Sequence, residues 1–351
     1  TEGQIMSSPA LGPDGTLYMA DFITGWDDKN YGRVWTLKDE SANGWELQKQ
    51  TETELQADYK ELSENDLKSK LYFEDQRVRR KAQFELAKRG KKGAAVFEKV
   101  IKDNSNQLAR VNAIVGLSQL ARMEDMSFAD ALAPLLKDSD SEIKAQAAKW
   151  IGDIRYDKAG PDLITGLKDE NSRVRFFSAE ALGRTANADA VQPLITLLQE
   201  NDDEDAYIRH AASLALSRIG KVDVIAALSS HESKAVRMGA VLALRRLESP
   251  ELAKFLSDSE ELIVTEAARA IHDDFSVPAA LPALGTLLST TIFQNEPLIR
   301  RAISANQRVG KEENLNNLIA YLGKSDTPEV LKTETLAAIG TWAKPSLLDR
   351  V

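Results

Sequence analysis

A sequence motif that recurs about every thirty residues constrains the fold of this chain more than any other feature. Each copy has a short loop with Asp, Asn or Ser, then an aliphatic residue, a cation and, about one turn later, a small residue, as in residues 171–179 (NSRVRFFSA). A Leu-rich stretch such as residues 190–198 (AVQPLITLL) accompanies each copy. Repeats of this length are helix pairs that bury their apolar faces only against neighbouring pairs. The motif therefore predicts a stacked helical array rather than a single globular core.

The cation of each copy is the most regular polar feature of the sequence. A binding interpretation is a strip that holds an anionic partner along the concave face of the array. The other interpretation is that each cation pairs with a loop Asp or a carbonyl group of its own repeat, and we expect this one because the repeat itself requires the position. The cations of this ladder are Arg79, Arg110, Lys144, Arg175, Arg209, Arg237, Arg300 and Lys332.

The segments 174–183 (VR…ALG) and 208–220 (IR…AL…IG) resemble short HEAT-like repeats, the type also found in bilin lyases. The resemblance extends over about residues 67–345. It implies a mostly α, armadillo-type solenoid of about nine helix pairs. It leaves the function open, because solenoids of this kind serve many tasks.

The N-terminal residues differ from everything after them. Pro13-Asp14-Gly15 is a turn signal, residues 16–20 and 33–37 have the composition of strands, and residues 25–32 form a polar loop between them. Two strands bury too little surface to be stable alone, so they must pair with further strands or pack on the helices.

This stretch, GPDGTLYMADF…GRVWTL, resembles the last blade of a β-propeller. The family is that of the sugar dehydrogenases that use pyrroloquinoline quinone, together with their NHL-type relatives. The resemblance implies a large bacterial parent in which a propeller, HEAT-like repeats and often a cytochrome c module follow one another. We accordingly expect a blade remnant at residues 1–38, a connector with the first helix at 39–66, and the solenoid at 67–351.

Composition narrows the classes of partner. The chain has 45 Lys and Arg against 54 Asp and Glu, a net charge of −9, which disfavours nucleic acids and anionic membranes as partners. It has no cysteine, which excludes disulfides, zinc–thiolate sites and Cys-linked haem from this chain. The sequence contains no run of about 20 apolar residues, which is the length needed to span a membrane. The first residues lack a basic start and an apolar core, so they do not resemble a signal peptide. The sequence also begins without Met and within a β-like pattern, so we interpret it as a segment or processed product of a longer protein.

The sequence gives little support for catalysis or metal binding. The three histidines, His210, His231 and His272, lie in different repeats and show no metal-ligand spacing. The acidic runs at 138–142 and 202–205 lack the Gly and the distant Glu of an EF-hand loop, so we expect them to cap helix N-termini. We therefore expect that the chain alone is no enzyme and holds no cofactor, whereas its parent would use quinone and haem c.

One helix position in each repeat is expected to face solvent. It is a candidate for a partner-binding surface, and the other interpretation is that these are single exposed side chains, which are common in proteins. The position follows the ladder cation directly, and the large apolar residues Phe176 and Met238 stand there, which can mark a contact surface. The residues of this predicted surface are Arg80, Phe176, His210, Met238 and Arg301.

These observations favour a non-catalytic interaction or spacer domain of a larger extracytoplasmic, periplasmic protein. Its partner would be a protein or the neighbouring domains of the same polypeptide. The alternative is a free-standing cytoplasmic HEAT adaptor. A HEAT-fold lyase or DNA-binding enzyme is a third class, disfavoured by the acidic balance and by the lack of an activated nucleophile.

Overall fold

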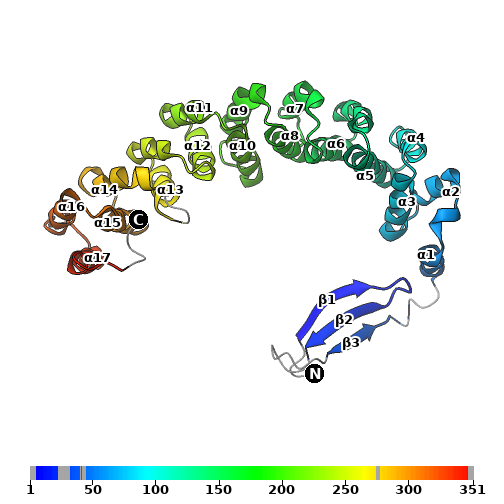
Figure 1. The fold of residues 1–351 in the computed structure, drawn as a ribbon, viewed down its shortest axis with the longest axis horizontal. Coiled ribbons are helices and arrows are strands. Elements are labelled where there is room, and N and C mark those ends of the chain that lie inside the picture. The colour runs from blue at the N-terminus through cyan, green and yellow to red at the C-terminus, as the bar shows by residue number, and fades with distance from the viewer. Residues whose placement is uncertain (1–4, 23–31, 40, 42–44, 274–276, 347–351) are drawn as a thin grey trace. The chain divides into compact units, whose positions relative to one another are not determined.

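The computed structural model describes residues 5–22, 32–39, 41, 45–273 and 277–346 (Figure 1). The chain divides into two compact units, residues 1–132 and 133–351. The first contains a small sheet and several helices, and the second is entirely helical in its described part. Within the described residues, no helix combines the length and the apolar character that crossing a membrane requires.

The sheet of the first unit has three antiparallel strands in the order β1 (Ile5–Leu11), β2 (Leu17–Phe22) and β3 (Arg33–Leu37). The turn between β1 and β2 follows the predicted Pro-Asp-Gly signal: Asp14 accepts hydrogen bonds from the Thr16 backbone N–H (3.1 Å) and hydroxyl (2.6 Å), and Gly15 has φ 75°. Strands were expected at 16–20 and 33–37, and both exist. β1 was not expected, because its central residues SSP do not resemble a strand and it pairs through an irregularity between Ser7 and Ala10. Most of the predicted loop at 25–32 lies outside the described residues.

The helices of the first unit follow the sheet in the chain. α2 begins with a capping box, in which the Ser63 hydroxyl accepts from the Asp66 N–H and the Asp66 carboxylate accepts from the Ser63 N–H. Leu67, Val78 and Phe97 are fully buried among these helices. The helices are α1 (Glu46–Gln56), η2 (Tyr59–Glu61), α2 (Glu64–Lys70), α3 (Gln76–Lys88), α4 (Lys91–Val100), α5 (Gln107–Met123) and η3 (Met126–Ala131).

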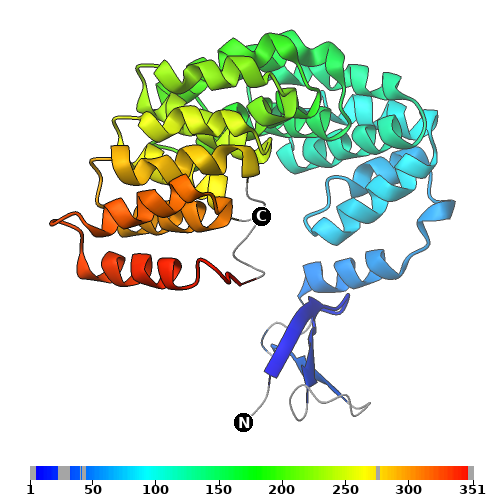
Figure 2. The ribbon, with the colours of Figure 1, turned by 60° about the vertical axis from the view of Figure 1, so that its left-hand side comes forward.

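The second unit alternates a first and a second helix in each repeat, and Figure 2 shows these helices stacked in succession. Its first helices are η4 (Ala133–Lys137), α7 (Gly160–Gly166), α9 (Val191–Asn201), α11 (Val222–Ala227), η8 (Pro250–Ser257), α14 (Leu281–Thr290) and α16 (Glu312–Leu322). Its second helices are α6 (Ser141–Asp153), α8 (Ser172–Arg184), α10 (Ala206–Ile219), α12 (Lys234–Arg246), α13 (Glu261–His272), α15 (Glu296–Val309) and α17 (Glu329–Gly340). The short turns η5 (Asp157–Ala159), η6 (Ala188–Ala190), η7 (Leu228–Ser230) and η9 (Pro278–Ala280) lie between them.

In several repeats the loop Asp or Asn of the motif caps the second helix that follows. Asp140 accepts from the Glu142 N–H (2.9 Å), Asn171 from the Arg173 N–H (2.9 Å) and Asp205 from the Tyr207 N–H (2.8 Å). These side chains satisfy N–H groups that have no partner within the helix. The motif therefore works locally as a helix start and, through its buried Leu and Ala residues, as one side of a shared core. The predicted α-solenoid with a small N-terminal β-segment is confirmed.

Candidate functional site

Three arginines from three consecutive repeats lie at the ends of neighbouring second helices. Arg184 is the last residue of α8, Arg218 the last but one of α10, and Arg246 the last of α12. Each follows the aliphatic residue of its own motif by ten positions, so the repeat places them at equivalent sites. We call Arg184, Arg218 and Arg246 the arginine row.

Close helix packing brings the ends of these second helices together. α8 lies between α6 and α10, and α10 lies between α8 and α12 (Figure 1). Gly152 of α6 faces the backbone of Ala181, and Gly183 of α8 faces the backbone of Ala215, with no room at either glycine for a further methyl group. Both contacts are near the C-terminal ends of the helices, which are the ends that carry the row.

Carboxylates compensate the arginine row only in part. Arg184 forms ion pairs with Asp153 and, through Nη2 at 3.4 Å, with Glu180. The same Glu180 carboxylate lies 3.9 Å from Arg218 Nη1. Arg246 forms no ion pair with any carboxylate among the described residues. The row thus carries more positive charge than its neighbours neutralise.

The electrostatics of Arg218 reflect this imbalance. Burial is the largest cause that lowers the pKa of Arg218. The positive charges of Arg184, Arg246 and Arg155 lower it further, whereas the negative charge of Glu180 raises it. The guanidinium groups are therefore close enough to repel one another across the repeats. An arginine of this kind stays charged, because its ordinary pKa is far above neutrality. Binding of an anion would relieve the repulsion.

A groove of about 500 Å³ adjoins the row on α10, α12 and α13. It contains a basic pair, Arg245 and Arg246, and the buried hydroxyl of Ser213, which has no hydrogen-bond partner among the described residues. The groove is lined by His210, Ser213, Leu242, Arg245, Arg246, Glu248, Ala270 and Asp273.

A second polar cluster joins α13 to α15 beside this groove. His272 Nδ1 lies 3.0 Å from Asp273 Oδ1, and its Nε2 lies 2.8 Å from the Ser304 hydroxyl. Arg301 donates to both oxygens of Asp273, from Nε at 2.9 Å and from Nη2 at 2.7 Å. Arg308 Nη1 donates to the His272 carbonyl at 3.1 Å.

The charges of this cluster follow from its contacts. Burial lowers the pKa of His272, while its hydrogen bond to Asp273 opposes that shift. The hydrogen bonds from Arg301 are the largest cause that lowers the pKa of Asp273 to about 2. The neutral ring is held between a hydroxyl and a carboxylate, an arrangement that can accept a proton from the hydroxyl. Arg301 already neutralises Asp273, so the cluster also serves as a polar link between two repeats.

The ladder cations contact their own repeats in several copies. Arg79, Arg175 and Arg237 each donate from Nη1, at 2.6–3.0 Å, to the carbonyl oxygens five and six residues earlier. Arg110 donates from Nε to the Ile101 carbonyl. Three other ladder cations form ion pairs: Lys144 with Asp169, Arg209 with Asp203, and Arg300 with Glu296 and Glu334. Lys332 is half-buried on α17. The use of this ladder by an anionic partner stays a prediction.

The residues of the predicted partner surface are not equally exposed. Arg80 and His210 are exposed, and Phe176 is half-buried with its ring edge-on to Phe177 at 5.1 Å. Met238 is only 6% exposed, so the expectation that it faces solvent is wrong. Arg301 is half-buried in the His272 cluster. The structure brings His210 to the groove and Arg301 close to it, and their role in binding stays a prediction.

The acidic runs at 138–142 and 202–205 lie at helix starts, where Asp140 and Asp205 act as caps. In the described part of the chain, no group of three His, Cys, Asp or Glu side chains could hold a metal ion. The expectations about cofactors and about nucleic acid stay predictions.

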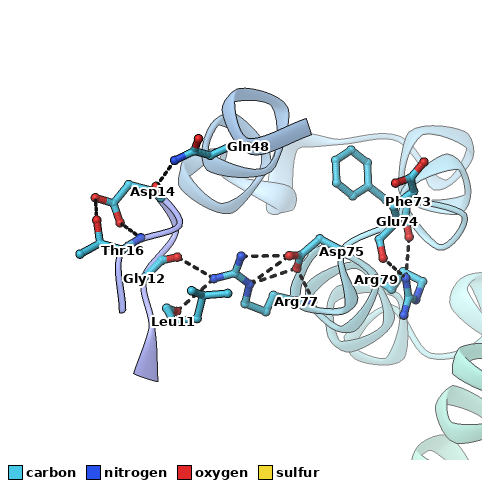
Figure 3. Close-up of polar contacts among 10 residues, drawn as sticks. All are labelled: Leu11, Gly12, Asp14, Thr16, Gln48, Phe73, Glu74, Asp75, Arg77 and Arg79. Carbon is cyan, nitrogen blue, oxygen red and sulfur yellow. Dashed lines mark hydrogen bonds and ion pairs between the residues drawn. The ribbon is translucent and has the colours of Figure 1, made fainter. Parts of the chain in front are cut away.

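The contacts that join the sheet to the helices converge on its first turn (Figure 3). Arg77 of α3 donates from Nη1 to the carbonyls of Leu11 (3.0 Å) and Gly12 (2.7 Å), while its Nε and Nη2 face Asp75. Gln48 of α1 donates to the Asp14 carbonyl. A cavity of about 280 Å³ lies beside these contacts, with Trp45 and Leu47 in its wall. The predicted packing of the β-segment on the first helices therefore takes place through this turn.

Comparison with known proteins identifies the repeats. A family model for HEAT repeats matches residues 129–217. The phycocyanobilin lyase subunit alpha of Picosynechococcus is 32% identical over 123 residues, which are 32% of this chain and 45% of that protein. The deoxyhypusine hydroxylase of Rattus norvegicus is 30% identical over 163 residues, which are 44% of this chain and 51% of that protein. The chain thus spans about half the length of these curated relatives. Among solved structures, importin beta aligns with 84% of this chain and 44% of its own, at a TM-score of 0.48 and 13% identity.

These comparisons confirm the HEAT repeats and correct one expectation. The chain alone was expected to be no enzyme, because its sequence showed no constellation of catalytic residues. The curated relatives are named as a lyase subunit and a hydroxylase, which points to HEAT-fold proteins that are enzymes. The expectation is therefore wrong. The expectation relied on motifs in the sequence, which do not reveal contacts that arise only when repeats stack, such as that between His272 and Ser304.

Proposed function

We propose that this chain acts as part of a HEAT-fold enzyme and binds a protein partner along its second helices α8, α10 and α12. The observation that carries the proposal is the arginine row, which presents three equivalent cations on three consecutive repeats. The relative from Picosynechococcus supports it, since that protein is named as a subunit of its lyase. A subunit needs a surface that recognises another chain.

The extent of the row favours a polypeptide over a small ligand. Packed helices lie about 8–10 Å apart, so three consecutive second helices extend the row over about 16–20 Å. The side chains of Arg184 and Arg218 are 35% and 36% exposed, and Arg246 is exposed, so all three can reach a partner. Electrostatic complementarity of this kind gives specificity and a fast association rate.

The test is photo-cross-linking of the chain to its partner in extracts of its own source cells. The triple variant Arg184→Glu, Arg218→Glu, Arg246→Glu should lose a single identified partner, whose cross-links in the unchanged chain should map to α8, α10 and α12. Lys254→Glu, on the first helix η8, is a charge-reversal control away from the row and should keep the partner. Retention of the partner by the triple variant would refute the proposal.

The sheet favours a second proposal, that β1–β3 is part of a propeller blade in a larger extracytoplasmic protein that uses quinone and haem c. Trp35 Nε1 donates to Asp21 across β2 and β3 at 3.1 Å, which fixes the blade-like pair. Val34 and Leu37 are 71% and 60% exposed, and a neighbouring blade would cover such apolar side chains. The test is to sequence the gene that encodes this chain and to assay its full-length product for dye-linked sugar oxidation. Absence of blade motifs upstream of Thr1 would refute it.

A further inference from the structure

The arginine row is a short basic surface with defined ends. The position that carries Arg184, Arg218 and Arg246 is occupied by Asp153 in the repeat before and by Asp273 in the repeat after. Asp153 is engaged by Arg184 and Asp273 by Arg301. Along five consecutive repeats this position is therefore occupied by Asp, Arg, Arg, Arg and Asp. A ligand that fits this surface carries negative charge over two repeat steps and none beyond them.

The spacing of the row selects a backbone conformation for a peptide ligand. Adjacent helices lie about 8–10 Å apart. An extended β-strand rises about 3.3 Å per residue but turns successive side chains to opposite faces, so residues i and i+3 do not share a face. A polyproline II helix rises about 3.1 Å per residue with three residues per turn, so every third side chain lies on one face at intervals of about 9.3 Å.

We infer that the arginine row binds a polyproline II segment of a partner protein whose carboxylates stand at positions i, i+3 and i+6. The inference rests on the proposed function and names the chemistry of the partner. Arg218 and Arg246 would each receive one carboxylate, and the third carboxylate would share Arg184 with Asp153 and Glu180. Charge-assisted hydrogen bonds of this type are stronger than neutral ones. Arg246 is accessible, and Arg218 has only its 3.9 Å contact with Glu180, so both can take a new partner without breaking a short ion pair.

A nucleic acid fits the same surface less well. In a duplex each strand places one phosphate per about 3.4 Å of helix axis, and the strand continues in both directions. Beyond the row its phosphates would find Asp153 and Asp273 at the equivalent positions in place of arginines, in a chain whose net charge is −9. A short acidic peptide needs no further cations, because its charges end where the row ends.

The experiment measures binding of fluorescein-labelled heptapeptides to the chain by fluorescence anisotropy at 50 mM and 200 mM salt. EPPEPPE carries glutamates at the inferred spacing, and EEEPPPP has the same composition with adjacent glutamates. We expect EPPEPPE to bind at least ten-fold more tightly, and Arg218→Gln to weaken it at least ten-fold. Lys254→Glu should leave both affinities unchanged. Circular dichroism of each variant should match that of the unchanged chain.

Three outcomes would overturn the inference. These are equal affinities for the two peptides, unchanged binding by the correctly folded Arg218→Gln chain, or preferred binding of a single-stranded oligonucleotide. The failure of the proposed function looks different. If the triple arginine variant keeps the cross-linked partner, the proposed function fails. If that variant loses its partner while the peptides show no preference, only the spacing inference fails.

Discussion

Replacing Gly183 with Ala tests the close packing that holds the arginine row together. A methyl group at Gly183 of α8 would lie 2.6 Å from the Cα and 2.9 Å from the Cβ of Ala215 on α10. Ordinary contact between such atoms begins at 3.4 Å. The two helices would therefore have to separate by about 0.8 Å, the difference between 3.4 and 2.6 Å, because both are backbone-anchored and neither side chain can rotate away.

The magnitude follows from two opposing terms. Forcing an extra methyl group into a packed interface costs about 1–3 kcal/mol. Ala is favoured over Gly within a helix by about 0.8–1.0 kcal/mol. Gly340, at the end of α17, provides the matched control, because a methyl group there would meet no atom within 4 Å. Since propensity acts in the same direction in both variants, their difference approximates the packing cost.

The assay is urea unfolding of both variants, followed by circular dichroism. Gly183→Ala should unfold at lower urea than Gly340→Ala, with a difference in unfolding free energy of about 1–3 kcal/mol. Hydrogen exchange should localise the effect to α8 and α10, because each repeat of such an array contacts only its neighbours. Equal midpoints for the two variants would show that α8 and α10 do not pack this closely, and would also remove the basis for the spacing of the row.

Three further changes test other contacts. Arg77→Ala should speed hydrogen exchange at the Gly12 amide about ten-fold, because Arg77 holds the first sheet turn, whereas the exposed control Arg80→Ala should not. Asn306→Ala should lower the unfolding free energy by about 2–3 kcal/mol in urea titrations, because the fully buried Asn306 bonds to the Gly285 and Ala302 carbonyls and to Asn314; the control is the exposed Asn316→Ala. Burial lowers the pKa of His272 below 6.5, so the unfolded chain binds more protons just below that pH, and stability should fall as pH drops through 6.5. His272→Gln should flatten this slope between pH 5 and 7, and an unchanged slope would contradict the assignment.

The fold was predictable because its determinants are local and repeated. Asn171 and Asp205 stand before their helices in the sequence, and in the structure they accept hydrogen bonds from the helix N-termini. The buried aliphatic residues that follow them, Val174 and Ile208, recur at fixed offsets. Each copy of the motif therefore contains both the residue that begins its helix and the aliphatic residue that marks the buried side of that helix. No contact between distant residues was needed to reach the solenoid.

Burial at the margins of the helices was harder to predict. Met238 was placed on the solvent side of its helix, yet it is 6% exposed. The second helices of a stacked array have neighbours on both sides, as α12 has in α10 and α13, so their buried arc is wider than that of a surface helix with one buried face. Phe176, at the equivalent position of α8, is half-buried for the same reason.

The candidate site was the least predictable part, because stacking creates it. His272 and Ser304 are 32 residues apart and belong to different repeats, so no spacing rule connects them. Their only sequence signal is that Asp273 follows His272 directly. The arginine row could be read from sequence only after the repeats were aligned at their aliphatic residue, since the ladder cations drew attention to a different position.

The two sets of cations show how repeat-imposed and partner-directed charges can be separated. In the ladder, the cation recurs in most copies, and Arg79, Arg175 and Arg237 repeat the same pair of carbonyl contacts. A feature that every repeat needs carries little information about a partner. At the tenth position the charge changes sign along the array, from Asp153 through the arginine row to Asp273, although the helices are built in the same way. Helix stability explains a cation at a helix end but does not require the two aspartates. The two aspartates have a structural role, because each forms an ion pair with an arginine of the next repeat, Asp153 with Arg184 and Asp273 with Arg301. Arg246 forms no such pair among the described residues, so it is the member of the row for which an anionic ligand supplies the best explanation.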